Sequence, residues 1–317
     1  PFITVDTEFM REKTYWPRLC LVQVGTPAEA MAIDAQTHGI DLAPLFELLA
    51  NQSVLKVFHA ARQDIEIFVN LTGHVPSPLF DTQIAAMVCG YGDSVGYERL
   101  VRDIVRESVD KTMRFTDWSR RPLGKKQIDY ALGDVIHLRE IYTNLAKQLE
   151  DSGRAEWLSE EMEVLNDTAT YLVSPEDAWK RLKTRSRKPR YLANVQALAA
   201  WREATAREND IPRSRVLKDE SLTEIAAHTP VSIDELMGLR AIKRDRVGDD
   251  RAREIIGLLD RVRAMGNEEL PEPPPERPYS SDNGASTELL KVLLKLKCDS
   301  HKVAQKLVAS SVDIEAI

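Results

Sequence analysis

Two acidic residues stand in an apolar stretch near the start of the chain. Asp6 and Glu8 occur within residues 2–9 (FITVDTEF), whose β-branched and aromatic residues predict a strand. Side chains alternate along a strand, so both carboxylates point to the same face. Two like charges this close repel each other unless a cation lies between them. The pair therefore indicates either a solvated strand face or part of a cation site.

Two further carboxylates occur where a predicted helix should be apolar. Asp64 falls on the stripe with Ile65 and Phe68 that should pack against a sheet, and an unpaired buried carboxylate is costly there. Tyr130 and Asp134 are spaced i, i+4, so they lie on one face of a helix. Taken singly, a salt bridge at the helix end would explain Asp64. An exposed hydrogen-bonded pair would explain the other two residues.

Together, four carboxylates and one phenol suit the hydrolysis of a phosphodiester. Hard divalent cations such as Mg²⁺ and Mn²⁺ prefer oxygen ligands. Two such ions about 4 Å apart bracket a phosphodiester, one activating a water and the other stabilising the leaving oxygen. On this hypothesis the carboxylates hold two ions, and the Tyr130 hydroxyl orients the attacking water.

A mixed α/β domain is predicted to position these residues. Three strand-like runs follow one another closely, which favours antiparallel hairpins. Strands then alternate with helices, which favours a mixed sheet with flanking helices. The predicted strands are 2–9, 19–25, 30–34, 54–58 and 79–81. The predicted helices are 41–51, 61–71, 82–89 and a long helix from Lys125, with apolar residues at spacings of three and four.

The rest of the chain is predicted to be helical. Helices are expected at 156–172 and 176–182, and Leu289, Leu290, Leu293 and Leu294 mark an apolar helix face near the end. Five prolines in residues 271–278 indicate an extended linker. The predicted organisation is an α/β domain (1–170), a basic connector (171–190), a helical domain (191–270), a proline-rich linker (271–286) and the start of a second helical domain (287–317).

Short motifs surround the candidate residues. They are VDTEF at 5–9, FHA at 58–60 followed by Asp64, FDTQ at 80–83, and Tyr130 four residues before Asp134. These motifs resemble those of the DEDD exonucleases, in the subgroup with tyrosine in the last motif. TDW at 116–118 and RPL at 121–123 resemble bacterial ribonuclease D. Residues 191–266, with WR, IPR, LKD and LR motifs, resemble the HRDC domain that RecQ-type helicases and ribonuclease D share.

The resemblance implies a ribonuclease-H-like fold and hydrolytic 3′→5′ removal of nucleotides as 5′-mononucleotides. It implies that Asp6, Glu8, Asp64 and Asp134 are ligands of two divalent cations, and that Tyr130 orients the nucleophilic water. It also implies single-stranded RNA 3′ ends as substrate, with maturation of tRNA and other stable RNA as the biological role.

Several residues near these motifs are candidates for substrate contact. Thr7 offers a main-chain N–H beside the acids, and Phe9 and Met10 would stack on or wedge the terminal base. The full set of candidates is Thr7, Phe9, Met10, His59, Gln83, Arg121 and Lys125. A structural role is the main alternative for His59. Residues 180–190 hold seven basic side chains, which indicates either a solvated linker or an arm that follows RNA phosphates.

Composition excludes several other classes of protein. The chain has 317 residues, 43% hydrophobic, with a net charge of −7. We find no apolar run near the roughly 20 residues that a membrane span needs, and no protein partner is evident. Three distant cysteines exclude a disulfide scaffold. A cytoplasmic location is expected, and because the sequence starts at Pro1, a further N-terminal piece is expected before it.

Two alternatives to an RNA exonuclease remain open. The same metal chemistry would cleave DNA, so a DNA 3′→5′ exonuclease acting in repair is the nearest rival. A nucleic-acid-binding scaffold without activity is the other, although all four acids and Tyr130 are present. RNA would be distinguished by contacts to its 2′-hydroxyls, which sequence does not reveal.

Overall fold

The chain packs into two units, described here from a computed structural model. The structure describes residues 1–110, 112–184, 186–242, 244–273 and 284–317. The first unit, which we call the sheet unit, holds residues 1–10, 18–171 and the described part of 278–317. The second, the helical unit, holds residues 11–17 and the described part of 172–277. The predicted linker at 271–286 lies mostly outside the described residues.

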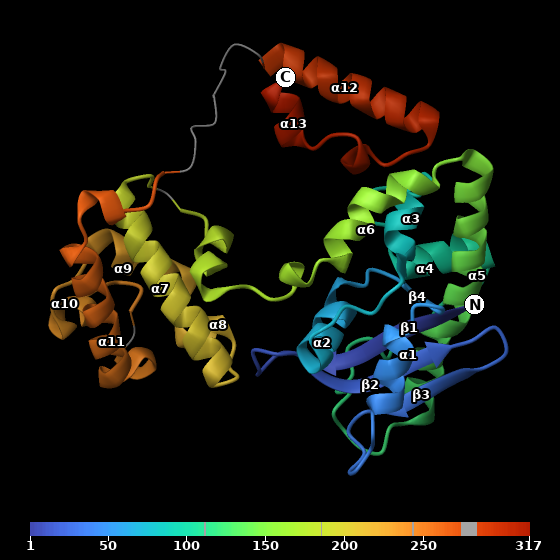
Figure 1. The fold of residues 1–317 in the computed structure, drawn as a ribbon, viewed down its shortest axis with the longest axis horizontal. Helices are drawn as coiled ribbons and strands as arrows, with labels where there is room; N and C mark the ends of the chain where they lie inside the picture. The colour runs from blue at the N-terminus through green and yellow to red at the C-terminus, as the bar shows by residue number, and fades with distance from the viewer. Residues whose placement is uncertain (111, 185, 243, 274–283) are drawn as a thin grey trace. The chain divides into compact units, whose positions relative to one another are not determined.

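A five-stranded mixed sheet forms the centre of the sheet unit (Figure 1). The strands are β1 (Phe2–Met10), β2 (Arg18–Gly25), β3 (Ala30–Asp34), β4 (Leu55–Phe58) and β5 (Leu79–Asp81). Their order is β3-β2-β1-β4-β5. β1, β2 and β3 pair antiparallel, whereas β4 is parallel to β1 and to β5. This confirms the predicted fold class, in which hairpins precede alternating strands and helices.

Helices cover both faces of this sheet. The helices of the sheet unit, not all of which contact the sheet, are α1 (Ala43–Ala50), α2 (Arg62–Thr72), α3 (Thr82–Val88), α4 (Tyr97–Leu100), α5 (Lys125–Ser152), α6 (Ser159–Asn166), α12 (Gly284–His301) and α13 (Ser311–Ala316). Odd-numbered β1 residues such as Ile3 and Val5 pack in the core with side chains of α1 and α2. Even-numbered residues face α5, which contacts β1, β2 and β3.

Contacts along β1 fix its position against α5. The ring of Phe2 lies 4.6 Å from that of Tyr142, and the buried Thr4 hydroxyl donates to the Val135 carbonyl over 2.7 Å. The strand and helix approach closely because Gly25 has no side chain. A Cβ there would collide with Thr4 Oγ1 and lie 3.1 Å from the Val135 oxygen. These contacts fix the position of Asp134 on α5 relative to the residues of β1.

One side of β1 is left without a neighbouring strand beyond Thr4. β4 pairs with β1 only at Phe2, Ile3 and Thr4, and then turns into α2. The second half of β1 is therefore bordered by β2 on one side and by the start of α2 on the other. This open edge lets residues from opposite faces of the sheet meet around the end of β1.

The helix predicted at 156–172 is wrong as a single element. The chain forms a 3₁₀ turn (Ala155–Leu158), then α6, then another 3₁₀ turn (Thr168–Thr170). Asp167 is extended, and its carboxylate accepts from the main-chain N–H of Ala169 over 2.9 Å. This local hydrogen bond competes with continuation of the helix. The helix predicted at 176–182 is a 3₁₀ helix instead (Pro175–Arg181).

The helical unit contains α7 (Pro189–Glu208), α8 (Arg213–Val216), α9 (Asp219–His228), α10 (Ile233–Met237) and α11 (Arg244–Ala264). Its core includes Val195, Leu198, Leu222 and Ile255. Glu203 is 1% exposed and pairs with Arg213, while the Tyr15 hydroxyl donates to the same carboxylate. The buried charge is thus neutralised and hydrogen-bonded, as a buried carboxylate requires.

The basic connector is partly used for structure. Arg190 donates to the carbonyls of Val262, Arg263 and Met265 at the end of α11, where a cation is favourable to the helix dipole. Lys180 forms an exposed ion pair with Asp177.

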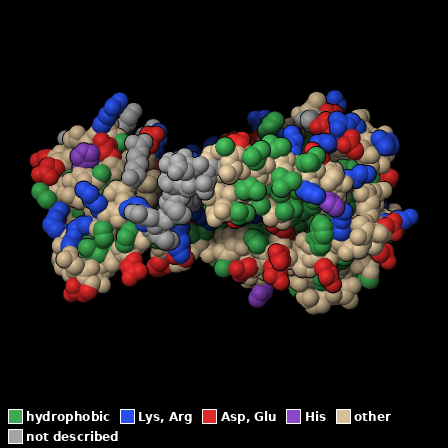
Figure 2. All heavy atoms as spheres, turned by 90° about the horizontal axis from the view of Figure 1, so that it is seen from above, with side chains coloured by type: hydrophobic (Ala, Val, Ile, Leu, Met, Phe, Trp, Pro, Cys, Tyr) green, Lys and Arg blue, Asp and Glu red, His purple; other side chains and the backbone are tan. Residues whose placement is uncertain are grey.

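The predicted apolar face of the last segment is largely solvent-exposed. Leu289 is 71% exposed and Leu293 is 48% exposed, whereas Leu290 and Leu294 are partly buried. Figure 2, seen from the side of α12, shows hydrophobic side chains gathered over this segment. Across the described ranges, no helix combines the length and the apolar character needed to cross a bilayer.

Candidate active site

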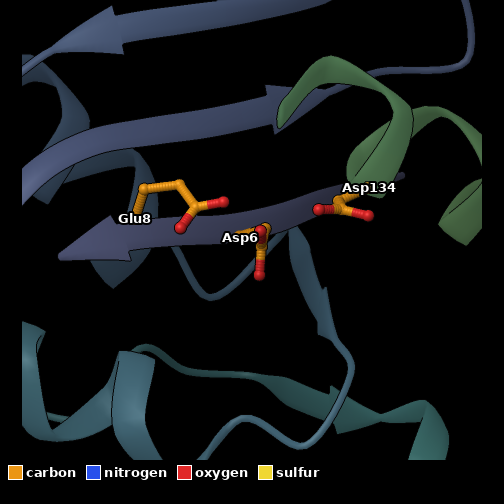
Figure 3. Close-up of side chains that lie close together, drawn as sticks. All are labelled: Asp6, Glu8 and Asp134. Atoms are coloured by element: carbon orange, nitrogen blue, oxygen red, sulfur yellow. The ribbon is translucent and has the colours of Figure 1, made fainter. Parts of the chain in front are cut away.

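Three of the predicted carboxylates meet between β1 and α5. Oxygens of Asp6, Glu8 and Asp134 all lie within 4.8 Å of one another. Asp6 and Glu8 project from β1, and Asp134 approaches from α5 (Figure 3). All three side chains are partly buried. The fold therefore brings these three carboxylates together and does not leave them as separate acids on the surface.

The fourth predicted carboxylate, Asp64, reaches the same end of β1 from α2. It is 7% exposed and accepts a hydrogen bond from the Thr7 hydroxyl. Asp64 is not part of the three-residue oxygen cluster, but its charge acts on Glu8, and the charge of Asp6 acts on Asp64. Thr7 was predicted to contribute its main chain. That group does hydrogen-bond to Asp6, and the side chain additionally holds Asp64.

Two tyrosine hydroxyls form hydrogen bonds with Asp134, one with its carboxylate and one with its main-chain carbonyl. The Tyr130 phenol hydrogen-bonds to the Asp134 carboxylate, as their i, i+4 spacing allows. The Tyr97 hydroxyl donates to the main-chain carbonyls of Asp134 and Gly133, over 2.6 and 3.1 Å. Tyr97 was not predicted from the sequence, because its partner is a helix carbonyl 37 residues away.

The carboxylates bind protons tightly because they lie beside one another and are partly or fully withdrawn from water. Burial, which has the largest effect, and the charges of Asp6 and Asp134 raise the pKa of Glu8 to about 10. Burial raises the pKa of Asp134 to about 7, against the lowering effect of the hydrogen bond from Tyr130. Burial and neighbouring carboxylates also raise the pKa of Asp6 and of Asp64 well above their ordinary values. A bound cation would reverse this preference by favouring the ionised forms.

The donor set fits a hard divalent cation, since every candidate ligand atom is a carboxylate oxygen. Gln23 supplies a second observation in favour of a cation at this site. It faces Asp6 across the β1–β2 ladder and is fully buried, and its amide has no hydrogen-bond partner among the described residues. Directly opposed side chains have Cβ atoms about 5 Å apart, so the Gln23 and Asp6 side chains leave the sheet on the same face. An ion with coordinated water would satisfy both groups.

Asp81 orders the main chain that leads to Asp64. Its carboxylate accepts from the N–H groups of Ala60 and Ala61, over 3.0 and 2.8 Å, and from Gln83 N over 2.7 Å. It therefore caps α3 and also fixes the turn into α2. Ala60 has a φ of 56°, a left-handed conformation that such bonds help to hold. The signal in the sequence was an Asp before a helix, which predicts only the cap.

Two of the predicted substrate contacts have structural partners. His59 Nδ1 lies 3.0 Å from Thr82 Oγ1, and burial lowers the pKa of His59. Gln83 Nε2 donates to the Val95 carbonyl over 3.0 Å. Both side chains are partly buried, and their contact with a substrate stays a prediction.

The remaining predicted contacts differ in how much of each side chain is committed. Arg121 pairs with Asp34 at 2.5 Å and donates to the Cys20 and Trp118 carbonyls, so the sheet uses its guanidinium to hold the loop before α5. Lys125 is exposed at the first turn of α5. Phe9 and Met10 are partly buried beyond a bulge that follows Glu8.

Comparison with known proteins agrees with this geometry. Residues 1–150 match the 3′-5′ exonuclease family and residues 192–259 match the HRDC domain. Ribonuclease D of Nitrobacter hamburgensis is 51% identical over all of this chain and 83% of its own length. The chain belongs to the ribonuclease D family. Ribonuclease D of a Jannaschia species is 50% identical, with the same coverage of both chains.

A solved ribonuclease D has the same fold. The crystal structure of Escherichia coli RNase D, described as an exoribonuclease involved in structured RNA processing, superposes with a TM-score of 0.86 at 32% identity. The match covers 99% of this chain and 83% of that one. The family, the fold class and the 3′→5′ exoribonuclease activity predicted from the sequence are thereby confirmed.

Proposed function

We propose that this ribonuclease D trims RNA 3′ ends with two divalent cations, Mg²⁺ or Mn²⁺, held by Asp6, Glu8, Asp64 and Asp134. The observation that carries the proposal is the cluster of three carboxylates whose oxygens lie within 4.8 Å. Partly buried carboxylates at this spacing repel one another unless cations share them. Asp64 lies beside Asp6 but outside the three-residue cluster, which suits it to a second ion.

The reaction is hydrolysis of the last phosphodiester bond. Two bound cations would activate a water for attack on the phosphorus and stabilise the leaving oxygen. A bond forms between the water oxygen and phosphorus, and the bond from phosphorus to the 3′ oxygen of the preceding nucleotide breaks. The proton passes to that oxygen. The products are a nucleoside 5′-monophosphate and an RNA one nucleotide shorter, with a free 3′-hydroxyl.

Tyr130 positions the attacking water and does not deprotonate it. Burial and the charges of Asp134 and Glu8 raise the pKa of its phenol above the ordinary value. The phenol therefore stays protonated at neutral pH and can serve as a hydrogen-bond donor. Its bond to Asp134 holds the hydroxyl at the edge of the carboxylate cluster.

RNA precursors with unpaired 3′ extensions, above all tRNA precursors, are the proposed substrates. The family name of the relatives and the description of the Escherichia coli enzyme support RNA as the substrate class. Phe9 and Met10 follow Glu8 directly on β1, where they would meet the terminal base. Lys125 is exposed at the first turn of the helix that carries Tyr130, where it would meet a phosphate.

The test is a time course with 5′-labelled and 3′-labelled oligomers of RNA and DNA, in Mg²⁺ and in EDTA. A hairpin with a 3′ extension represents a tRNA precursor. We expect stepwise shortening of the 5′-labelled RNA and release of labelled 5′-mononucleotide from the 3′ label, only with metal. Equal turnover in EDTA would exclude the two-cation mechanism, and faster cleavage of DNA would exclude RNA as the preferred substrate.

A further inference from the structure

The loop before α5 presents an aromatic ring to solvent. Phe115 is 90% exposed, more than any other large hydrophobic side chain of the described residues. The guanidinium of Arg114 lies over this ring, 5.3 Å from its centroid. A single exposed apolar residue is ordinary on a protein surface, so exposure alone carries no functional argument. The position of the loop supplies one.

Neighbours of Phe115 tie this loop to the part of α5 that carries Tyr130. The next residue, Thr116, accepts a hydrogen bond from Gln127 Nε2 over 3.2 Å, and Gln127 lies one helical turn before Tyr130. Trp118 is 2% exposed, with its ring 6.1 Å from that of Tyr130. The loop is thus anchored beside the catalytic tyrosine while Phe115 points to solvent.

The charge around this ring suits a nucleic acid strand. Arg114 is close enough to Tyr130 for its charge to act on the phenol, and Arg120, Lys125 and Lys126 are exposed in the same segment. An aromatic ring next to basic side chains is the usual composition of a surface that stacks unpaired bases and follows phosphates. A protein partner would gain less from a ring already covered on one side by a cation.

We propose that Phe115 and Arg114 form a stacking site for one unpaired base of the RNA strand that enters the active site. Phe115 stacks on the base, and Arg114 contacts the phosphate next to it. This inference rests on the proposed function, because it assumes that an RNA 3′ end occupies the carboxylate cluster. It predicts a requirement for unpaired nucleotides close to the scissile bond, without preference for a base type.

The first test measures binding of an eight-nucleotide single-stranded RNA, in EDTA to prevent cleavage. We expect Phe115→Ala to raise the Kd by ~10- to 100-fold. Phe115→Trp should bind like the wild type. Phe115→Leu keeps an apolar side chain without a ring, so its Kd should rise nearly as much as that of Phe115→Ala. Unchanged Kd values for both Phe115→Ala and Phe115→Leu would overturn the proposal.

Trp157→Ala is the matched control. Trp157 is 50% exposed, and the guanidinium of Arg154 lies 5.1 Å from its ring centroid, so the pair repeats the chemistry of Phe115 and Arg114. It follows the end of α5 at Ser152, 18 residues beyond Asp134, which is about 27 Å along the helix. We expect the Kd of Trp157→Ala to equal that of the wild type. An equal loss in both alanine variants would mean nonspecific binding and would refute the site.

The second test identifies the stacked nucleotide. A series of RNAs, each with one abasic nucleotide, is bound by wild type and by Phe115→Ala. Wild type should lose affinity at one position near the 3′ end, and the variant should be insensitive at that position. Additive losses at every position would overturn the proposal. Arg114→Gln should also reduce the slope of log Kd against log salt by ~0.7, as for one phosphate contact on a single strand.

Cleavage measurements distinguish this inference from the proposed function. If wild type cleaves RNA with Mg²⁺, Phe115→Ala should raise KM by ~10- to 100-fold and leave kcat within about twofold. A KM equal to that of the wild type overturns the stacking site alone. If wild type does not cleave RNA, the proposed function fails, and the Kd series still decides whether Phe115 binds a base.

Discussion

Replacing Asp134 by Asn should stabilise the metal-free enzyme while it abolishes hydrolysis. The substitution keeps the shape of the side chain and removes one negative charge from the cluster. The structure raises the pKa of Asp134 from 3.8 to about 7. Each tenfold change in proton affinity is worth about 1.4 kcal/mol, so ionising Asp134 at pH 8 costs the folded protein about 4 kcal/mol relative to the unfolded chain.

The expected gain in the free energy of unfolding is therefore about 1–4 kcal/mol at pH 8. The upper figure applies if Asn keeps the hydrogen bond from Tyr130. At pH 5 the folded wild type already binds the proton, so the gain should fall below about 2 kcal/mol. Mg²⁺ should raise the unfolding midpoint of the wild type much more than that of the variant, and kcat should fall by about 10³-fold or more, equivalent to roughly 4 kcal/mol.

The measurement is urea unfolding of chelated protein at pH 5 and pH 8, with and without Mg²⁺. Asp129→Asn is the control, because Asp129 lies on the exposed face of the same helix. It should leave both stability and activity nearly unchanged. A variant at Asp134 that is less stable than the wild type in EDTA at pH 8, or one that cleaves RNA at the wild-type rate, would refute the reasoning.

Three further outcomes follow from the contacts of the site and of the helical unit. Tyr97→Phe removes the hydroxyl that donates to the Asp134 carbonyl and should lower kcat about 10-fold with little change in KM, by steady-state kinetics; an unchanged kcat would contradict a positioning role. Metal-free wild type should lose stability as the pH rises from about 5 to 8, because the raised pKa values of Asp134 (about 7) and Glu8 (about 10) mean that the folded state binds more protons. Mg²⁺ should restore that loss, and a flat pH profile in EDTA would contradict it. Glu203→Gln should cost about 3 kcal/mol: burial raises the pKa of Glu203, but the hydrogen bond from Arg213 holds it below the ordinary value. The stabilisation by Glu203 is therefore present above about pH 4.5 and lost as the pH falls, which thermal unfolding from pH 3 to 7 will test.

Local pattern was enough to predict most secondary structure. The alternation of apolar and polar residues and the β-branched residues located the strands within one or two residues. Side chains alternate between the two faces of a strand, so a strand with one buried face leaves a local pattern in the sequence. The break at Asp167 was not predicted, since a side chain that bonds the main chain two residues on leaves little trace in helical periodicity. The predicted domain boundaries and the roles of the substrate contacts remain predictions.

The sequence by itself determined which side chains share a face. Asp6 and Glu8 alternate onto one side of β1, and Tyr130 and Asp134 stack on one side of α5, because strand and helix periods are properties of the backbone. Only the tertiary structure decided that these two faces meet. That meeting depends on Thr4, which bonds α5 across 131 positions, and on Gly25, which leaves room for it. Contacts between residues so distant in the sequence follow from packing, and no local period encodes them.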